Sequence, residues 1–153
     1  MPKFRPLPFA RAALALAAVC VAAHASAAPN PVPEAGQDWR GSYVCDGIRT
    51  PLELTIEYVN RGVSPTRSGP ALGVRARFAF GDPRDVQHSG KYIVEGAYFI
   101  AARDMQLEPV RWIVRPPGYL MVGLSGHLTD APRAYAGRID AGNCAGFSLH
   151  AVR

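Results

Sequence analysis

The sequence is poor in the residues that most often form metal sites and cross-links. Its 153 residues include three cysteines, four histidines and only two lysines. No two histidines lie at a short metal-binding spacing such as H-x-H or H-E-x-x-H. No apolar run reaches the roughly 20 residues that a membrane-spanning helix needs, and no segment keeps the i, i+3, i+4 apolar spacing of an amphipathic helix. We therefore expect no metal site, no cofactor, no transmembrane segment and no helical body.

The first 27 residues have the three parts of a secretory signal. An apolar run, Ala12–Ala23, is followed by the small-x-small sequence that ends at Ala27. Three cations and no acid precede the run: Lys3, Arg5 and Arg11. The alternatives are a lipid anchor at Cys20, which Val19 before it disfavours, and a membrane anchor, for which the run is too short. The pattern predicts cleavage near Ala27 and a periplasmic or secreted protein.

Removal of this signal leaves 126 residues, enough for one domain with its own core. They carry 14 basic and 12 acidic residues, a net charge of +2, which does not indicate nucleic-acid binding. Cys45 and Cys144 are the only cysteines that remain, and an even number in an oxidising compartment predicts a disulfide rather than two free active-site thiols. Closing a loop of about 100 residues stabilises the fold by roughly 4–5 kcal/mol at most.

The pattern after residue 37 has a period of two, which is typical of strands with one buried face. Residues 28–37 contain three prolines and are predicted to be a tether before a domain at 38–153. The domain is expected to be all-β, a small antiparallel barrel or sandwich of about eight strands. The expected strands are residues 39–45, 52–58, 74–80, 91–101, 105–108, 118–128, 134–140 and 144–152.

Three local expectations accompany this fold. Gly118–Leu128 is apolar on both faces and should be a central strand. The one candidate helical turn is Val110–Val114, although prolines crowd it. Cys144 is out of phase with Phe147, and a bulge near Gly146 would correct this.

No catalytic motif is complete. Ser125 and His127 lie in a sequence similar to a nucleophile elbow, which lacks the second glycine and the following helix. Two polar segments, 60–71 and 81–90, are long for loops, and the first carries Arg61 and Arg67 as candidate binding residues. Trp112 and Tyr119 flank two prolines and would form either an aromatic platform or, as we favour, a packed barrel end.

Three sequence patterns cover most of the predicted domain: W-x-G-x-Y-x-C at 39–45, L-x-P-x-x-W-I-x-x-P-x-G-Y at 107–119, and G-R-I-D-x-x-x-C-x-x-F-x-L at 137–149. Together they resemble an uncharacterised β domain of exported bacterial proteins, which implies a fold and export but no activity. The chain is also similar to the periplasmic inhibitors of C-type lysozyme in its Y-x-C start and in Ser89-Gly90-Lys91-Tyr92. That resemblance implies that Ser89 and Tyr92 contact the enzyme, although the family's Thr-Lys-Gly element is absent.

The sequence thus favours a non-catalytic binding module for a protein or cell-envelope partner, with a lysozyme inhibitor as one form of it. A carrier of a small apolar ligand is the first alternative, with Gly73, Ala76 and Gly123 leaving room inside the barrel. The second is a hydrolase whose residues the sequence does not bring together.

Overall fold

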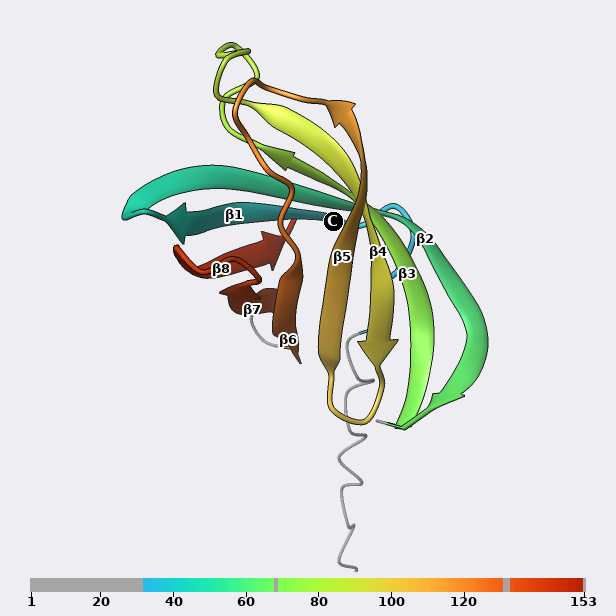
Figure 1. Ribbon diagram of the computed structural model, residues 1–153. Coiled ribbons are helices and arrows are strands. Elements are labelled where there is room, and N and C mark those ends of the chain that lie inside the picture. Colours follow the sequence, from blue (N-terminus) through green and yellow to red (C-terminus); the bar gives the residue numbers. More distant parts are fainter. Residues whose placement is uncertain (1–31, 68, 131–132, 153) are drawn as a thin grey trace, which may run out of the picture.

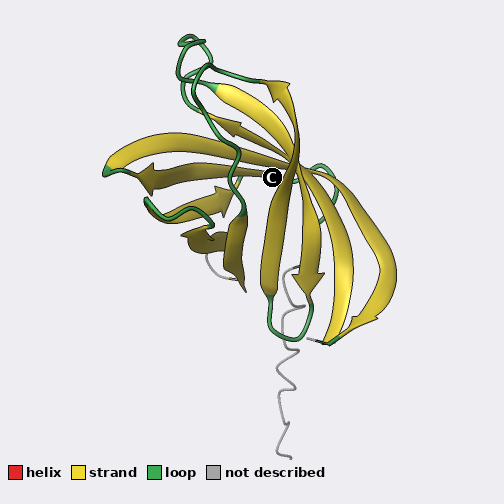
Figure 2. Ribbon diagram, viewed as in Figure 1, coloured by secondary structure: helices red, strands yellow, loops and turns green. Residues whose placement is uncertain are grey.

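The computed structural model describes residues 32–67, 69–130 and 133–152, and within them all regular secondary structure is β (Figures 1 and 2). The predicted export signal lies outside the described residues. No helix of the described residues is long and apolar enough to cross a membrane. The eight strands are β1 (Asp38–Cys45), β2 (Ile48–Thr66), β3 (Gly69–Phe80), β4 (Gly90–Phe99), β5 (Asp104–Val114), β6 (Leu124–Asp130), β7 (Arg133–Ile139) and β8 (Cys144–Ala151).

The strands form a closed antiparallel barrel in which each strand pairs with the next along the chain and β8 pairs with β1. This confirms the predicted all-β fold and decides for a barrel over a sandwich. The two ends of the domain meet at the closing pair, where Trp39 lies opposite Ala151 and the Val152 amide donates to the Asp38 carbonyl at 2.8 Å. Four connections gather at the other end of the barrel, which we call the loop end: residues 46–47, 81–89, 115–123 and 140–143.

The predicted disulfide between Cys45 and Cys144 is present and joins β1 to β8 at the loop end. Its register also confirms the predicted bulge. Tyr43 lies opposite Phe147 and Cys45 lies opposite Cys144, so β8 contains one residue more than β1 between these two pairs. The extra residue restores the phase between the disulfide and the inward-facing side chains of β8.

Alternation of apolar and polar residues decides which side chains fill the barrel. In β2, Leu52, Leu54 and Ile56 are buried while the residues between them are not. Aromatic rings make up much of the interior at the loop end, where Phe78 stacks on Tyr92 with ring centroids 4.4 Å apart. Ala76 is fully buried in the same core, so its small side chain is enclosed by packing partners.

Two predicted loops or turns are strands instead. Residues 60–71, expected as a long loop, belong mostly to β2 and β3, which continue as a ribbon with Ser64 opposite Ala71 and Thr66 opposite Gly69. The ribbon has no hydrophobic alternation, since its side chains are largely exposed, and this is why the pattern missed it. Val110–Val114, considered as a helical turn, is the end of β5 and extends the expected strand at 105–108.

The predicted central strand at 118–128 is wrong in its first half. Residues 115–123 form the β5–β6 loop, and β6 begins only at Leu124. The apolar residues Tyr119, Met121 and Val122 of this loop pack against the core from the loop end rather than within the sheet. Pro116 and Pro117 lack amide hydrogens for a ladder, which explains the break.

The described part of the predicted tether is bound to the barrel. Gln37 is 5% exposed, and its carbonyl accepts a hydrogen bond from the Ile56 amide at 2.9 Å. The Gly36 amide donates in turn to the Ile56 carbonyl at 2.8 Å. Residues 36–37 therefore continue the β1–β2 ladder one step beyond β1.

Candidate functional site

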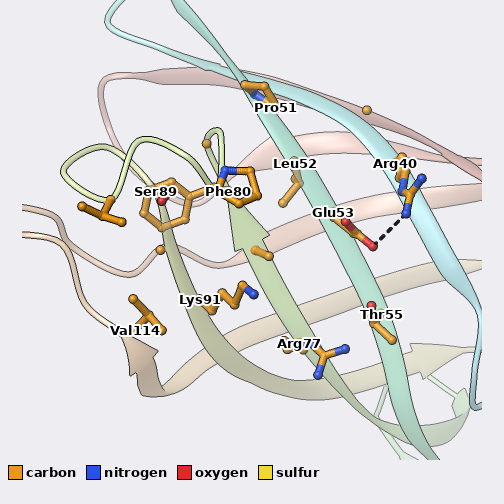
Figure 3. Close-up of a pocket in the computed structure, with 16 residues that line it drawn as sticks. Arg40, Pro51, Leu52, Glu53, Thr55, Arg77, Phe80, Ser89, Lys91 and Val114 are labelled. Atoms are coloured by element: carbon orange, nitrogen blue, oxygen red, sulfur yellow. Dashed lines mark hydrogen bonds and ion pairs between the residues drawn. The ribbon is translucent and has the colours of Figure 1, made fainter.

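The loop end has two hollows. One, which we call the outer groove, lies on the outside of β1–β4 beneath the β3–β4 loop and has a volume of about 670 Å³. The other, the mouth recess, lies at the opening of the barrel and has a volume of about 410 Å³. Figure 3 shows the outer groove. Its polar and charged side chains come mainly from outward positions of the strands: Arg40, Glu53, Thr55, Arg77, Ser89 and Lys91.

Strand register assembles these charges. Arg40 on β1 lies opposite Glu53 on β2, Glu53 lies opposite Ala79 on β3, and Ala79 lies opposite Lys91 on β4. Because Ala79 stands between Glu53 and Lys91 in this row, the sheet surface is low between their long side chains. Arg77 occupies the next outward position of β3 and lines the same groove.

The groove is cationic. Among the described residues, its lining holds Arg40, Arg77 and Lys91 against one acid, Glu53, a net charge of +2, and Arg77 also contacts Glu57, outside the lining, at 3.6 Å. Arg40 contacts Glu53 at 3.4 Å, and their side chains are 62% and 43% exposed. In the described part of the chain, no ion pair includes Lys91. An exposed ion pair such as Arg40–Glu53 contributes at most about 1 kcal/mol, so an acidic ligand that binds Arg40 more strongly can displace Glu53 from it.

The β3–β4 loop that borders the groove is held by its own acids. Asp82 accepts from the Arg84 amide at 2.9 Å, and Asp85 contacts the His88 ring nitrogen Nδ1 at 2.8 Å. The hydrogen bond from His88 lowers the pKa of the Asp85 carboxyl. Ser89 follows this turn and lines the groove.

Tyr92, paired with Ser89 in the lysozyme-inhibitor resemblance, points into the barrel and is 1% exposed. Its hydroxyl donates to the Val122 carbonyl at 2.9 Å and accepts from the Val122 amide at 3.3 Å. Burial raises the pKa of this hydroxyl, which therefore stays protonated and able to donate. Ser89 and Tyr92 thus lie on different sides of the sheet.

Trp112 and Tyr119 lie at the same end, partly buried, and each contacts core rings. Trp112 packs edge-on against Tyr92 at 5.1 Å between centroids, and Tyr119 lies 5.3 Å from Phe80. Tyr119 also lines the mouth recess, together with the disulfide and the 80% exposed Leu120. Arg61 and Arg67 lie instead on the β2–β3 ribbon, at the opposite end of the barrel, and are exposed.

The residues of the incomplete nucleophile elbow lie on β6, with Ser125 half-buried and His127 exposed, and they bond to separate acids. The Ser125 hydroxyl donates to Asp140 at 2.8 Å, whereas the His127 ring contacts Asp104 at 3.0 Å. Among residues 32–67, 69–130 and 133–152, no three His, Cys, Asp or Glu side chains are placed to hold a metal ion.

Comparison of the sequence with protein-family models and with curated proteins finds no match. The outer groove was missed by sequence reasoning, although Arg40, Arg77 and Lys91 each stand at a polar position of an alternating strand. Their common location depends on the pairing of β1 to β4, which single-strand periodicity does not contain.

Proposed function

We propose that this protein is a non-catalytic, exported binding module that holds an acidic segment of a partner protein in the outer groove. The observation that carries the proposal is the placing of Arg40, Arg77 and Lys91 around the low Ala79 position, with Glu53 as the one acid among the described residues of the lining. Arginine and lysine side chains donate several hydrogen bonds to carboxylates, and none of them accepts one. The groove is therefore complementary to a ligand with at least two carboxylates.

Apolar surface at the rim adds to this complementarity. Val86 in the β3–β4 loop and Val114 at the end of β5 line the groove, and they are 69% and 50% exposed. Covering exposed apolar area contributes about 25 cal/mol per Å². A peptide with apolar residues between its acids would use both kinds of contact, whereas a polyanion without apolar groups would use one.

The disulfide supports the export part of the proposal. Disulfides persist in the periplasm and outside the cell but are reduced in the cytosol. The bond between Cys45 and Cys144 closes the barrel at the end that carries the groove. An oxidising compartment would thus preserve the disulfide that joins β1 to β8.

Isothermal titration calorimetry with an octa-glutamate peptide at 50 mM salt tests the groove. We expect binding to the wild type, an affinity at least tenfold weaker in Lys91→Glu, and no change in Arg61→Glu, which alters charge equally at the far end. Affinity should also fall as salt rises, because the contacts are exposed. Equal affinities of the two variants would contradict the proposal. An effect of Arg61→Glu alone would place the site on the β2–β3 ribbon.

The natural partner can then be sought with the same variants. A protein retained from envelope extract by the wild type and Arg61→Glu, but lost with Lys91→Glu, would be the groove ligand. Retention of a glycan or lipid polymer in this pattern would assign the groove to an envelope component instead. The lysozyme-inhibitor form of the proposal is tested by C-type lysozyme activity, which a micromolar excess of protein should slow through Ser89 and the groove.

A carrier of a small apolar ligand is the second candidate, and the mouth recess favours it. Leu120 and Ile48 at its rim are 80% and 68% exposed, and rings of Phe80 and Tyr119 lie beneath them. A fluorescent apolar probe, N-phenyl-1-naphthylamine, should brighten with the wild type and not with Leu120→Arg if this function is correct. Equal fluorescence of the two proteins would remove it.

A further inference from the structure

In the described part of the chain, the hydrogen-bonded ladder is incomplete along one side of β5. β5 pairs with β4 from Asp104 to Val114, but it pairs with β6 only from Asp104 to Leu107. β6 begins at Leu124, and the chain between the two strands is loop. In Figure 1, β5 runs along the length of β4, whereas β6 lies beside only one half of β5. Glu108–Val114 is thus a strand edge, which we call the free edge.

In the described ranges, no strand pairs with the backbone of the free edge on the side away from β4. Among the described residues, no backbone hydrogen bond outside the strand ladders involves residues 108–114. Closure removes edges from most barrels, and an edge left open presents amide and carbonyl groups to any added strand. Three of the side chains along it are apolar and exposed: Val110 is 48%, Ile113 46% and Val114 50% exposed.

Two features limit what the free edge can accept. Pro109 has no amide hydrogen, and the register with β4 shifts on either side of Arg111, leaving Val110 and Ile113 as extra residues. Bulges and prolines are common devices against unlimited edge pairing. They leave room for a short strand of four to six residues, roughly the usual strand length, and oppose open-ended stacking.

We propose that the free edge binds an extended segment of another protein as an added β-strand, with an acidic residue opposite Arg111. Arg111 is exposed, and it is in no ion pair of the described residues. It lies opposite Ile93 on β4, which lies opposite Arg77 on β3, so the outer surface beside the edge carries two arginines in one row. An incoming acid extends this row with the complementary charge.

A second copy of this chain fits the edge less well. Antiparallel pairing of two copies along the whole of Glu108–Val114 is centred on the middle residue, Arg111. Arg111 of one copy would then lie opposite Arg111 of the other, and like charges directly opposite one another destabilise a strand pair. Registers that avoid this pairing overlap only part of the edge, because residues before Glu108 already pair with β6.

The inference concerns a surface next to the outer groove and does not depend on it. Val114 belongs to both, but the groove binds through side chains, whereas the free edge binds through backbone hydrogen bonds with side chains adding specificity. Amide protection is therefore a readout that groove binding does not produce.

The test uses the disulfide-intact protein and an eight-residue peptide of alternating threonine and valine with one central glutamate. At 1 mM peptide, hydrogen exchange of the amides in Val110–Val114 should slow at least tenfold. Arg111→Glu should weaken binding at least tenfold, and the peptide with lysine in place of glutamate should bind this variant as the first peptide binds the wild type. Lys91→Gln should leave edge protection in place even if it abolishes groove binding.

Several results would overturn the proposal. Unchanged exchange at 110–114 at this peptide concentration is one, and equal binding of the glutamate peptide by the wild type and Arg111→Glu is another. Slower exchange at 110–114 without peptide as protein concentration rises, with a dimer in sedimentation, would assign the edge to a second copy instead. Far-ultraviolet circular dichroism of Arg111→Glu identical to that of the wild type confirms that the variant is folded.

Discussion

Removal of a single hydroxyl, in Tyr92→Phe, tests how the β5–β6 loop is fastened across the loop end. The ring of Tyr92 is 1% exposed and packs between Phe78 and Trp112, and phenylalanine keeps all of these contacts. Only the two hydrogen bonds between the Tyr92 hydroxyl and the backbone of Val122 are lost. The substitution therefore isolates the attachment of the loop from the packing of the core.

The expected cost follows from these two bonds. A hydrogen bond contributes about 1 kcal/mol net, and Val122 is only half-buried, so water satisfies part of what the variant leaves unpaired. We expect the free energy of unfolding to fall by about 2 kcal/mol. For a domain of this size, that corresponds to a decrease in Tm of roughly 8 °C.

Urea unfolding of the disulfide-intact protein measures the change, with Tyr58→Phe as the matched control. Tyr58 is 57% exposed, and loss of its hydroxyl should alter stability by less than about 0.5 kcal/mol. The Val122 amide should exchange faster in Tyr92→Phe, while octa-glutamate binding should be unchanged. A loss of less than about 0.5 kcal/mol, or an unaltered Val122 exchange rate, would refute the account of the loop. Loss of ligand binding in a variant with unchanged stability would move Tyr92 from the core to the binding surface.

Two further predictions concern backbone approach and the β3–β4 loop. Gly41→Ala should destabilise the barrel by about 1–3 kcal/mol, because a Cβ atom there would collide with the Ser148 carbonyl of β8. Gly142 lies in open space, so the control Gly142→Ala should have little effect. Thermal unfolding compares the two variants, and equal Tm values would disprove the close β1–β8 contact. The lowered pKa of Asp85 means that its bond with His88 is present above the ordinary carboxyl pKa and is lost as pH falls through the lowered value. In His88→Ala, carboxyl-carbon NMR should show the Asp85 pKa returning upward towards 3.8, and an unchanged titration would exclude the His88 contact as its cause.

Strands with one apolar face could be predicted because their alternation is a local property. Leu52, Leu54 and Ile56 define the buried face of β2 without reference to any other strand. The even number of cysteines after the predicted export signal likewise predicted the disulfide, and the phase of Cys144 predicted the bulge. The alternation depends only on neighbouring residues, whereas the disulfide joins residues 99 apart and was predicted from the cysteine count alone.

The proposed binding surfaces could not be predicted in the same way, because they depend on which strands lie side by side. Lys91 and Glu53 are far apart in the sequence, and only the register of β3 brings Ala79 between them. The free edge of β5 depends on where β6 begins, and the apolar residues 119–122 disguised that boundary by packing across the barrel end instead of within a strand. Hydrophobicity indicates that a residue is covered, but not whether a strand or a loop covers it.

Because every strand pairs with its neighbour in the chain and the last pairs with the first, the order of strands is a ring that happens to be cut between β8 and β1. The hydrogen bond from the Val152 amide to the Asp38 carbonyl shows how little chain would be needed to join that cut. A circular permutant with new termini in the β2–β3 turn, beside Arg67, would keep every strand pair. It would also move both termini to the tip of the ribbon, so that a fused reporter could be attached far from the loop end.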